Sequence, residues 1–410
     1  MSRLHCRSCG TELKHSFLDL GHTPLANSYV KKETVWTADK QYPLHARVCG
    51  NCFLVQVEDV VPPEDIFSDY AYFSSYASSW VEHARNYAES AIKRFDLNEK
   101  SFVVEVASND GYLLQHFVKQ SIQVLGIEPA ANVAAEARKK SVPTTVAFFG
   151  RETALKVRAD HGPADLMAAN NVLAHVPDIN DFVAGFEALL SDEGVVSFEF
   201  PSLLNLIENV QFDTIYHEHF SYLSLFAIEK CFSRNGLKVF DVEELSTHGG
   251  SYRVWACKKN ADRGETDNLK KVRQREKAAK LDALVGYQNF EPRAQKLRDD
   301  LLAFLRRAKA EGKRVIGYGA AAKGNTLLNY CGIDQELVSH VADLNPHKQN
   351  TLLPGSRIPV ISPDEISDIK PDYILILPWN LKTEISGSLA YVRNWGCRFV
   401  IPVPTTEVLA

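Results

Sequence analysis

The sequence predicts an α/β protein with a doubly wound sheet at its centre, a small cysteine-bearing module before it and a second α/β unit after it. Three stretches carry this prediction: a buried strand, tight loop and helix over residues 102–117, two Cys-x-x-Cys pairs near the N-terminus, and a strand with a glycine-rich loop from residue 314. Apolar runs that alternate with amphipathic stretches are typical of a parallel sheet covered by helices. At 410 residues the chain is long enough for two or three domains.

Composition argues against several classes of partner. Lys and Arg number 46 against 51 Asp and Glu, so the chain has no electrostatic reason to bind nucleic acid or a membrane surface. The sequence has no run of 18 apolar residues and no apolar signal segment near its N-terminus. We therefore expect a cytoplasmic protein without nucleic-acid or membrane partners.

Four of the eight cysteines form two close pairs, Cys6 with Cys9 and Cys49 with Cys52. Each Cys-x-x-Cys brings two thiolates to one side of a tight turn, and two such turns complete a tetrahedral zinc site. Four sulfur ligands leave no coordination position for a substrate, so this metal would be structural. Disulfides are less expected in a cytosolic protein, and a redox pair would follow a strand and open a helix, which neither pair does.

The module closes with an aromatic, serine-rich segment that carries Tyr70, Tyr72 and Tyr76. A tyrosine combines a ring with a polar tip. These residues could pack against a neighbouring domain, or they could line a pocket as hydroxyl donors, and the residues alone leave both interpretations open.

The first strand of the predicted sheet ends in the loop 107–111, and the next apolar run ends in Glu128 and Pro129. In open α/β sheets ligands bind where strand carboxyl ends meet such loops, and an acidic residue about 20 positions later can accept hydrogen bonds from a ribose diol. The loop has no Gly-x-Gly-x-x-Gly fingerprint, so it provides poorly for a dinucleotide pyrophosphate. S-adenosylmethionine (AdoMet) needs carboxylates for its ammonium and ribose but no phosphate cradle, and it fits better. The competing interpretation is an ordinary βαβ unit without a ligand.

A later strand of the same domain also ends in polar residues. Asn170 and Asn171 close an apolar run and His175 follows them, again where a ligand would lie. The alternative for His175 is a histidine at a helix end without a functional role.

The segment 214–224 concentrates titratable groups: Tyr216, His217, Glu218, His219 and Tyr222. It is not the His-Glu-x-x-His pattern, so a zinc-protease helix is excluded. His217 and His219 share a face only in an extended chain, and a metal site there has no further support. A partly desolvated histidine among aromatic rings can transfer protons near neutral pH. On the residues alone, catalysis and structural hydrogen bonding are equally open.

The second α/β unit begins with a strand, a loop of glycines and alanines, and Lys323, Asn325 and Thr326 at the start of a helix. Backbone N–H groups at a helix start, together with a lysine, suit a diphosphate. A generic tight turn is the alternative. Trp379 and Asn380 follow a later strand, where the ring could stack on a base and the amide could read its edge.

Together these stretches resemble the three-domain bacterial C-methyltransferases of nucleotide-linked 4-keto-deoxysugars, of the C-3 methyltransferase type with an N-terminal zinc-binding module. The resemblance extends over nearly the whole chain and rests on motifs in all three parts. The motifs are the paired Cys-x-x-Cys, Pro24-Leu-Ala-Asn-Ser, the segment 70–80, Ser108-Asn-Asp-Gly111, Tyr216-His-Glu-His219, His248-Gly-Gly-Ser-Tyr-Arg253, Gly317-Tyr-Gly-Ala-Ala-Ala-Lys-Gly-Asn-Thr326 and Leu377-Pro-Trp-Asn380. One departure is Ala107, where the family usually has glycine.

The resemblance implies three domains. They are a zinc-binding module over residues 1–75, a class I AdoMet-dependent methyltransferase domain over 76–260, and a C-terminal Rossmann-like domain over 261–410 that binds the nucleotide sugar. The implied cofactors are AdoMet and a structural Zn²⁺, the implied partner is a nucleotide-diphosphate sugar substrate, and we expect a monomer.

Methylation of a carbon next to a ketone requires a base for the α-proton and donors for the developing oxyanion. By resemblance His219 is the base and Glu218 orients its neighbours. The sugar and its enolate would be held by Tyr216, Tyr222, His175 and Tyr70, with Tyr72 and Tyr76 beside them. AdoMet would be surrounded by Glu105, Ser108, Asn109, Asp110, Gly111, Glu128, Pro129 and Asn171. The nucleotide diphosphate would contact Lys323, Asn325, Thr326, Trp379 and Asn380.

The predicted function is AdoMet-dependent C-methylation, at C-3, of a nucleotide-linked 4-keto-6-deoxyhexose through a base-generated enolate. One alternative is an NAD(P)-dependent ketoreductase, for which Asp343 lies at a suitable distance from the Gly317 loop although the loop lacks the full fingerprint. The other is a non-enzymatic sugar-nucleotide binding protein. Thymidine, guanosine and cytidine are all candidates for the base, and C-5 is the alternative carbon.

Overall fold

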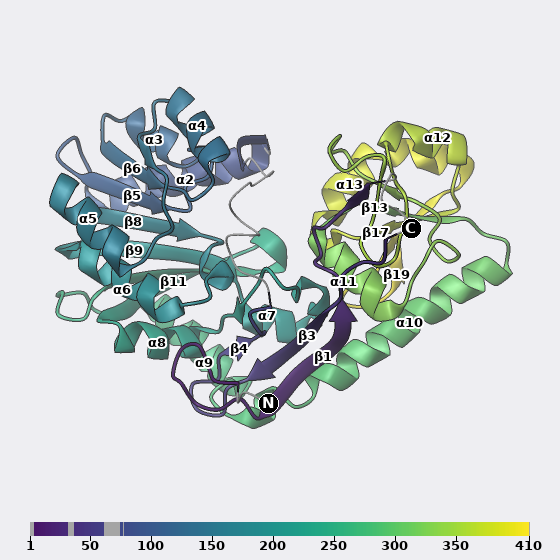
Figure 1. Cartoon of the computed structure of the whole chain (residues 1–410), viewed down its shortest axis with the longest axis horizontal. Helices are drawn as coiled ribbons and strands as arrows, with labels where there is room; N and C mark the ends of the chain where they lie inside the picture. The colour runs from purple at the N-terminus through teal and green to yellow at the C-terminus, as the bar shows by residue number, and fades with distance from the viewer. Residues whose placement is uncertain (1–3, 32–36, 61–73, 77, 410) are drawn as a thin grey trace.

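The computed structural model describes residues 4–31, 37–60, 74–76 and 78–409. It has two lobes joined at their base, which give the molecule a V shape (Figure 1). The teal lobe holds the central sheet, the yellow-green lobe holds the C-terminal sheet, and purple strands from the N-terminal part lie where the lobes meet.

The N-terminal part forms a four-stranded antiparallel sheet whose last strand comes from the middle of the chain. The order is β1 (His15–Thr23), β3 (Tyr42–Val48), β4 (Val55–Gln56) and β10 (Ser221–Tyr222). A short strand, β2 (Val30–Lys31), pairs with β15 (Thr351–Leu352) of the C-terminal lobe. Backbone hydrogen bonds therefore join the N-terminal part to both lobes.

The central lobe contains a seven-stranded sheet. Its order is β11 (Leu237–Leu245), β12 (Ser251–Lys258), β9 (Leu190–Pro201), β8 (Ala164–Asn170), β5 (Phe102–Val106), β6 (Gln123–Ile127) and β7 (Thr144–Thr145). The strands from β9 to β7 are parallel, and β12 is antiparallel to both of its neighbours. Every residue of β5 is buried, as expected for a parallel strand with helices on both faces. The predicted doubly wound sheet is confirmed.

Helices cover both faces of this sheet. They are α2 (Ser78–Phe95), α3 (Leu114–Val118), α4 (Ala131–Lys139), α5 (Arg151–His161), α6 (Ile179–Leu189), α8 (Leu225–Arg234) and α9 (Asp267–Ala278). The helix α7 (Leu203–Glu208) packs with the N-terminal sheet instead. Polar side chains set several of their starts: Asp178, Ser224 and Thr266 each accept backbone N–H groups of the first turn of α6, α8 and α9.

The C-terminal lobe contains a six-stranded sheet. Its order is β16 (Val360–Ile361), β14 (Val341–Ala342), β13 (Val315–Tyr318), β17 (Tyr373–Ile376), β18 (Arg398–Ile401) and β19 (Glu407–Val408). All neighbours are parallel except β18 and β19. The helices are α10 (Phe290–Ala310), α11 (Ala322–Cys331), α12 (Ile366–Ile369) and α13 (Lys382–Ser388). The strand order reverses at β13, so the loop between β13 and α11 lies where ligands bind in such sheets.

The N-terminal sheet and the C-terminal lobe share one hydrophobic core, in which Phe17 stacks on Phe290 of α10 with ring centroids 4.5 Å apart. Two further clusters of buried apolar residues lie in the central lobe. The chain segments of the N-terminal part thus fold against distant segments, and β10 joins that part across the domain limit predicted at residue 75. In the part of the chain that the structure describes, none of the helices has the length and apolar composition needed to cross a lipid bilayer.

Candidate active site

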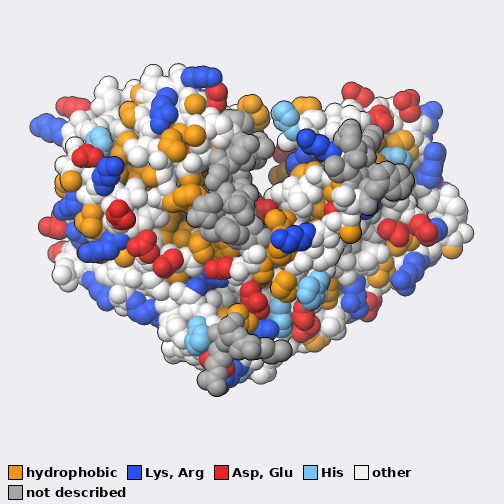
Figure 2. Space-filling view, viewed as in Figure 1, with side chains coloured by type: hydrophobic (Ala, Val, Ile, Leu, Met, Phe, Trp, Pro, Cys, Tyr) orange, Lys and Arg blue, Asp and Glu red, His pale blue; other side chains and the backbone are white. Residues whose placement is uncertain are grey.

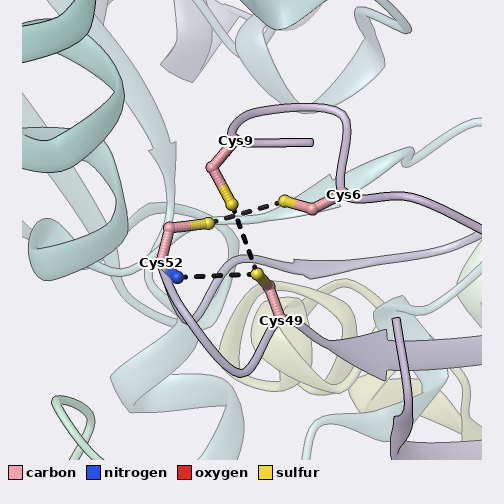
Figure 3. Close-up of side chains that lie close together, drawn as sticks. All are labelled: Cys6, Cys9, Cys49 and Cys52. Atoms are coloured by element: carbon pink, nitrogen blue, oxygen red, sulfur yellow. Dashed lines mark hydrogen bonds between the residues drawn. The ribbon is translucent and has the colours of Figure 1, made fainter. Parts of the chain in front are cut away.

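The four paired cysteines converge on one point (Figure 3). Their Sγ atoms all lie within 4.8 Å of one another, and the pairs Cys6–Cys52 and Cys9–Cys49 are 3.5 Å apart. These separations exceed a disulfide length of about 2.05 Å. Four sulfurs about 2.3 Å from a central Zn²⁺ would be about 3.8 Å apart. The Sγ–Sγ separations of this cluster, from 3.5 Å up to at most 4.8 Å, include that value. Gln56 Nε2 also donates to Cys6 Sγ at 3.2 Å, as outer hydrogen bonds do around zinc thiolates.

The predicted loop after β5 has a left-handed backbone at two residues with side chains. Ala107 has φ +55° and Asn109 has φ +49°. Because a residue with a Cβ is strained in this region, a glycine at position 107 would be the relaxed choice. The backbone N–H of Ala107 donates to Ile127 O at 2.8 Å, which places the loop against the end of β6. Glu128 lies there too, and its two carboxylate oxygens accept the N–H groups of Asn109 and Ala130 at 3.0 and 2.9 Å.

Glu105, at the end of β5, is completely buried, and neither of its carboxylate oxygens has a hydrogen bond of normal geometry. Burial raises the pKa of this carboxyl well above its ordinary value. Unpartnered buried polar atoms also occur on nearby residues at this edge of the sheet: Ser108 Oγ, Asp110 Oδ1, Asn170 Oδ1 and Asn171 Oδ1. The hydroxyl of Tyr112 lies beside Glu105 and partly compensates its carboxyl group. A buried carboxylate with so little compensation is costly unless a cation or a further donor completes it. The cluster therefore fits a ligand that carries an ammonium and hydroxyl groups, as AdoMet does.

Glu105→Gln is expected to stabilise the ligand-free protein at neutral pH and to weaken binding of S-adenosylhomocysteine (AdoHcy). Folding raises the pKa of Glu105 above its value of about 4.5 in the unfolded chain. Above pH 4.5 the unfolded protein has therefore lost a proton that the folded protein still holds. The free energy of unfolding falls as the pH rises through this range. The variant should therefore melt higher than wild type at pH 7.5, with the difference vanishing below pH 4.5. Loss of a charge-assisted hydrogen bond, about 1.5–3 kcal/mol, should weaken AdoHcy about 10- to 100-fold.

Melting curves and calorimetry with AdoHcy check this prediction. Glu276→Gln is the matched control, because Glu276 is a buried carboxyl whose pKa burial raises to about 7 while it accepts N–H groups at the start of α8. That variant should bind AdoHcy as wild type does. Unchanged affinity of Glu105→Gln would remove Glu105 from the cofactor site.

Asn109 and Asp110 use part of their side chains to hold another segment. Asn109 Oδ1 accepts the N–H of Ser74 at 2.9 Å, and Asp110 Oδ2 accepts that of Ser75 and a bond from Lys140 Nζ at 2.9 Å. They thus tie the Ser74–Tyr76 turn to the loop. Tyr76 is 85% exposed, and the predicted site residues Tyr70 and Tyr72 lie outside the described residues. Gly111 (φ +76°) and Pro129 lie on the two loops as expected from the sequence.

His219 is held through both ring nitrogens. Nδ1 donates to Thr214 O at 3.0 Å, so Nε2 is the acceptor, and the Tyr216 hydroxyl lies 2.8 Å from it. Burial lowers the pKa of His219 well below its usual range. The imidazole is therefore neutral at pH 7, with its proton-accepting nitrogen facing a phenol.

Three other predicted catalytic residues surround this pair. His175 packs edge-on against His219 with centroids 4.7 Å apart, and its Nδ1 donates to Glu218 O at 2.7 Å. Burial lowers the His175 pKa to about 4. The Glu218 carboxylate accepts Asn27 Nδ2 on both oxygens at 2.8 Å, and Tyr222 hydroxyl accepts the N–H of Tyr216 at 3.2 Å. Because η3 (Leu173–His175) directly follows β8, this cluster lies at the same sheet edge as the loop 107–111.

His217 is not part of the cluster. Its Nε2 donates to Pro43 O at 3.1 Å and its ring packs on Tyr42. Among the described residues, the four cysteines form the one group with the spacing of metal ligands. The structure therefore does not support a metal site formed by His217 and His219.

The predicted diphosphate residues divide into two sets. Lys323 Nζ bonds to Asn380 Oδ1 and lies 4.5 Å from the centroid of the Trp379 ring. Burial lowers the Lys323 pKa to about 8, while the nearby Asp213 opposes the shift. Trp379 Nε1 donates to Asp213 Oδ2 at 2.6 Å.

Asn325 and Thr326 use their side chains to bind backbone oxygens of other segments. Both are buried, and they donate to the backbone oxygens of Ala26 at 2.6 Å and Ile215 at 3.1 Å. The structure thus brings Lys323, Trp379 and Asn380 together, whereas these two side chains bond to other parts of the chain. Their predicted contact with substrate stays a prediction.

A buried charged cluster beside the sheet edge was not predicted from the sequence. Glu199 of β9 accepts Arg253 of β12 at 2.8 Å and lies 2.9 Å from His83 of α2, on which Trp80 stacks. A glutamate inside the apolar run Val-Ser-Phe-Glu-Phe was the available signal, because a buried charge requires a partner. Trp80 also contacts His248 edge-on.

His248 links the two sides of the site. The side chain of His248 is exposed to solvent, but the protein around it and the charge of Lys323 lower its pKa, and His248 in turn contributes to the lowered pKa of His219. Gly249 packs directly under Trp379, since a Cβ there would lie 2.5 Å from the ring. The 247–250 turn therefore lies between the base cluster and the Lys323 cluster. On the face that Figure 2 shows, the surface is hollowed between the two lobes.

Comparisons with known proteins match all three parts of the chain. Three family models match: a zinc binding domain over residues 6–67, a methyltransferase domain over 80–242 and a C-methyltransferase C-terminal domain over 246–404. The chain is 35% identical over 405 residues to C-methyltransferase NovU of Streptomyces niveus, which covers 99% of this chain and 96% of that protein. A shorter similarity, 24% over 115 residues, covers 26% of this chain and 46% of the ubiquinone biosynthesis O-methyltransferase of Rhodopseudomonas palustris (strain BisA53).

Among solved structures, the chain is similar to magnesium protoporphyrin IX methyltransferase (ChlM) from Synechocystis PCC 6803 with bound SAM. The TM-score is 0.36 at 12% identity, over 50% of this chain and 100% of that one. The PH0226 protein of Pyrococcus horikoshii OT3 gives a TM-score of 0.38 at 13% identity, over 48% and 98%.

Proposed function

This chain belongs to the C-methyltransferase family, and from that premise we propose that it transfers the AdoMet methyl group to C-3 of a nucleotide-linked 4-keto-6-deoxyhexose. The chain is an AdoMet-dependent methyltransferase, with a class I methyltransferase domain and a zinc-binding N-terminal module. The choice of sugar, carbon and site residues is the proposal. We also expect the protein to be cytoplasmic and to act as a monomer.

The observation that carries the proposal is the orientation of His219. Its Nδ1–H is committed to Thr214 O, so Nε2 carries the lone pair, which accepts the Tyr216 O–H at 2.8 Å and would become available when that hydroxyl turns to the substrate. A neutral imidazole in this state can accept a proton from carbon once a substrate is bound. O-methylation would need no such base for a carbon-bound proton, whereas C-methylation next to a ketone does.

The surrounding groups suit an enolate. Removal of the α-proton places negative charge on the ketone oxygen, and the hydroxyl of Tyr216, which lies beside His219, would be the donor to it. His175 uses its Nδ1–H on Glu218 O, so its ring would support the position of His219 and not donate to the enolate. Glu218, fixed by Asn27, would hold the backbone to which His175 is bonded. When bound, AdoMet supplies an electrophilic methyl group, and Glu105, Asn171 and Glu128 would hold its ammonium and ribose.

The nucleotide end of the substrate has a separate group of residues. The ammonium of Lys323 would pair with the diphosphate, and Asn380 and Trp379 would contact the nucleotide. Separation of this cationic cluster from the base cluster by the short 247–250 turn suits a substrate with a sugar at one end and a nucleotide at the other.

Incubation of the protein with AdoMet and a panel of 4-keto-6-deoxyhexoses linked to dTDP, GDP or CDP tests the proposal. We expect one member to gain a methyl group on the carbon next to the ketone, located by NMR of the product. Failure to methylate any member, or loss of an exchangeable α-proton without methylation, would count against it. Membership in a methyltransferase family already disfavours the ketoreductase and the non-enzymatic binding protein as alternatives.

A further inference from the structure

The carbonyl oxygen of Thr214 accepts a hydrogen bond from the ring of His219. Because it accepts the Nδ1–H, it fixes the tautomer of the ring and the direction in which the Nε2 lone pair points. The position of the proposed base therefore depends on the position of one backbone carbonyl.

Two side chains of the C-terminal lobe bond to the residues on either side of Thr214. Trp379 Nε1–H donates to Asp213 Oδ2 at 2.6 Å, and Thr326 Oγ1–H donates to Ile215 O at 3.1 Å. Asp213 and Ile215 are completely buried, and Thr326 is 3% exposed. Hydrogen bonds in such a low-dielectric environment are strong and hold geometry well.

We propose that Thr326 and Trp379 are positioning residues that set the orientation of His219 by bracketing Thr214. This inference rests on the proposed role of His219 as base. It assigns to the C-terminal lobe a second task besides binding the nucleotide: it holds a catalytic group of the central lobe in place. Lys323 lies one turn before Thr326 on α11 and contacts the Trp379 ring. The two positioning residues, Thr326 and Trp379, therefore lie next to a residue predicted to bind the diphosphate.

The competing interpretation is that Thr326 contacts the substrate, as its place in the loop motif predicted. A direct contact would appear in KM, whereas a positioning role appears in kcat and in the state of the His219 ring. The two interpretations are therefore separable by measurement.

Thr326→Val keeps the volume of the side chain and removes its hydroxyl. With the panel member that wild type methylates, we expect kcat to fall roughly 10- to 100-fold, as small misplacements of a catalytic group do, at unchanged KM and AdoHcy affinity. Thr326→Ser should restore most of kcat. Thr23→Val is the matched control, because Thr23 is also buried and donates to a backbone oxygen, that of Pro24, at 3.0 Å.

The ligand-free protein gives a second readout. In protein labelled with 15N-histidine, NMR should show His219 of wild type in its Nδ1–H tautomer, and both Thr326→Val and Trp379→Phe should lower the population of that tautomer. In a His219→Asn background, Thr326→Val should cost no further activity, because residues that act as a unit are not additive.

Three outcomes would overturn the inference: wild-type kcat with an unchanged His219 tautomer, a change in KM alone, or a full additional loss in the His219→Asn background. If Thr326→Val does not fold, the tautomer in Trp379→Phe decides. An active His219→Asn enzyme would instead refute the proposed base, which is a different result from an inert Thr326→Val substitution in an enzyme that needs His219.

Discussion

His219→Asn is expected to lower kcat about 10³-fold, within the range that general bases contribute, and to leave AdoHcy and nucleotide binding intact. The asparagine amide can still donate to Thr214 O, so the segment should keep its shape while it loses the basic nitrogen. Steady-state kinetics gives kcat, and calorimetry with AdoHcy and with the nucleotide diphosphate gives the two affinities.

His217→Asn is the matched control, because His217 is buried in the same segment but bonds to Pro43 O. Its turnover should stay within a few-fold of wild type. The pH profile adds a check: because the pKa of His219 lies well below its usual range, kcat/KM of wild type should stay level from pH 7.5 to 6.5 and fall only at lower pH. Near wild-type turnover of His219→Asn would remove the residue from the base role.

Loss of the metal is expected to have the largest effect on stability. Structural zinc contributes roughly 10–16 kcal/mol of apparent binding energy in small zinc folds, which is comparable to the whole stability of a domain. Cys49→Ser should abolish stoichiometric zinc and unfold the N-terminal sheet. Because β10 is the edge strand of that sheet and lies two residues from His219, turnover should be lost as well.

Metal analysis, thermal unfolding and turnover measure these effects. Cys257→Ala is the matched control, since Cys257 is a buried cysteine of β12 outside the metal cluster. It should keep one equivalent of zinc and lose about 1 kcal/mol or less, a few degrees in melting temperature. A Cys49→Ser protein that melts and turns over like Cys257→Ala would show that the metal is dispensable.

The sequence was most informative where chemistry depends on local spacing. The two Cys-x-x-Cys pairs predicted the cysteine cluster, and the apolar run before Ala107 predicted the buried strand and its loop. The resemblance and the predicted methyltransferase, AdoMet and zinc are confirmed by the family models and the full-length relative. The individual catalytic and binding roles stay predictions.

Contacts between distant segments could not be predicted in this way. Trp379 and Asp213 are 166 positions apart, and nothing in either local sequence indicates that they bond. The pairing of β10 with β4 and the shared core of the N-terminal sheet and C-terminal lobe depend equally on long-range packing. Asn325 and Thr326 illustrate the limit: they stand in a loop motif typical of ligand binding, yet their hydrogen bonds are to Ala26 and Ile215.

In the proposed reaction, His219 reaches one substrate carbon from one side and the methyl donor reaches it from the other. A crystal structure with AdoHcy and the keto sugar that wild type methylates tests it most directly. We predict that the carbon next to the ketone lies about 3–3.5 Å from His219 Nε2, with the AdoHcy sulfur facing the opposite side of the same carbon. A complex in which no carbon of the sugar is within reach of both groups would contradict the account.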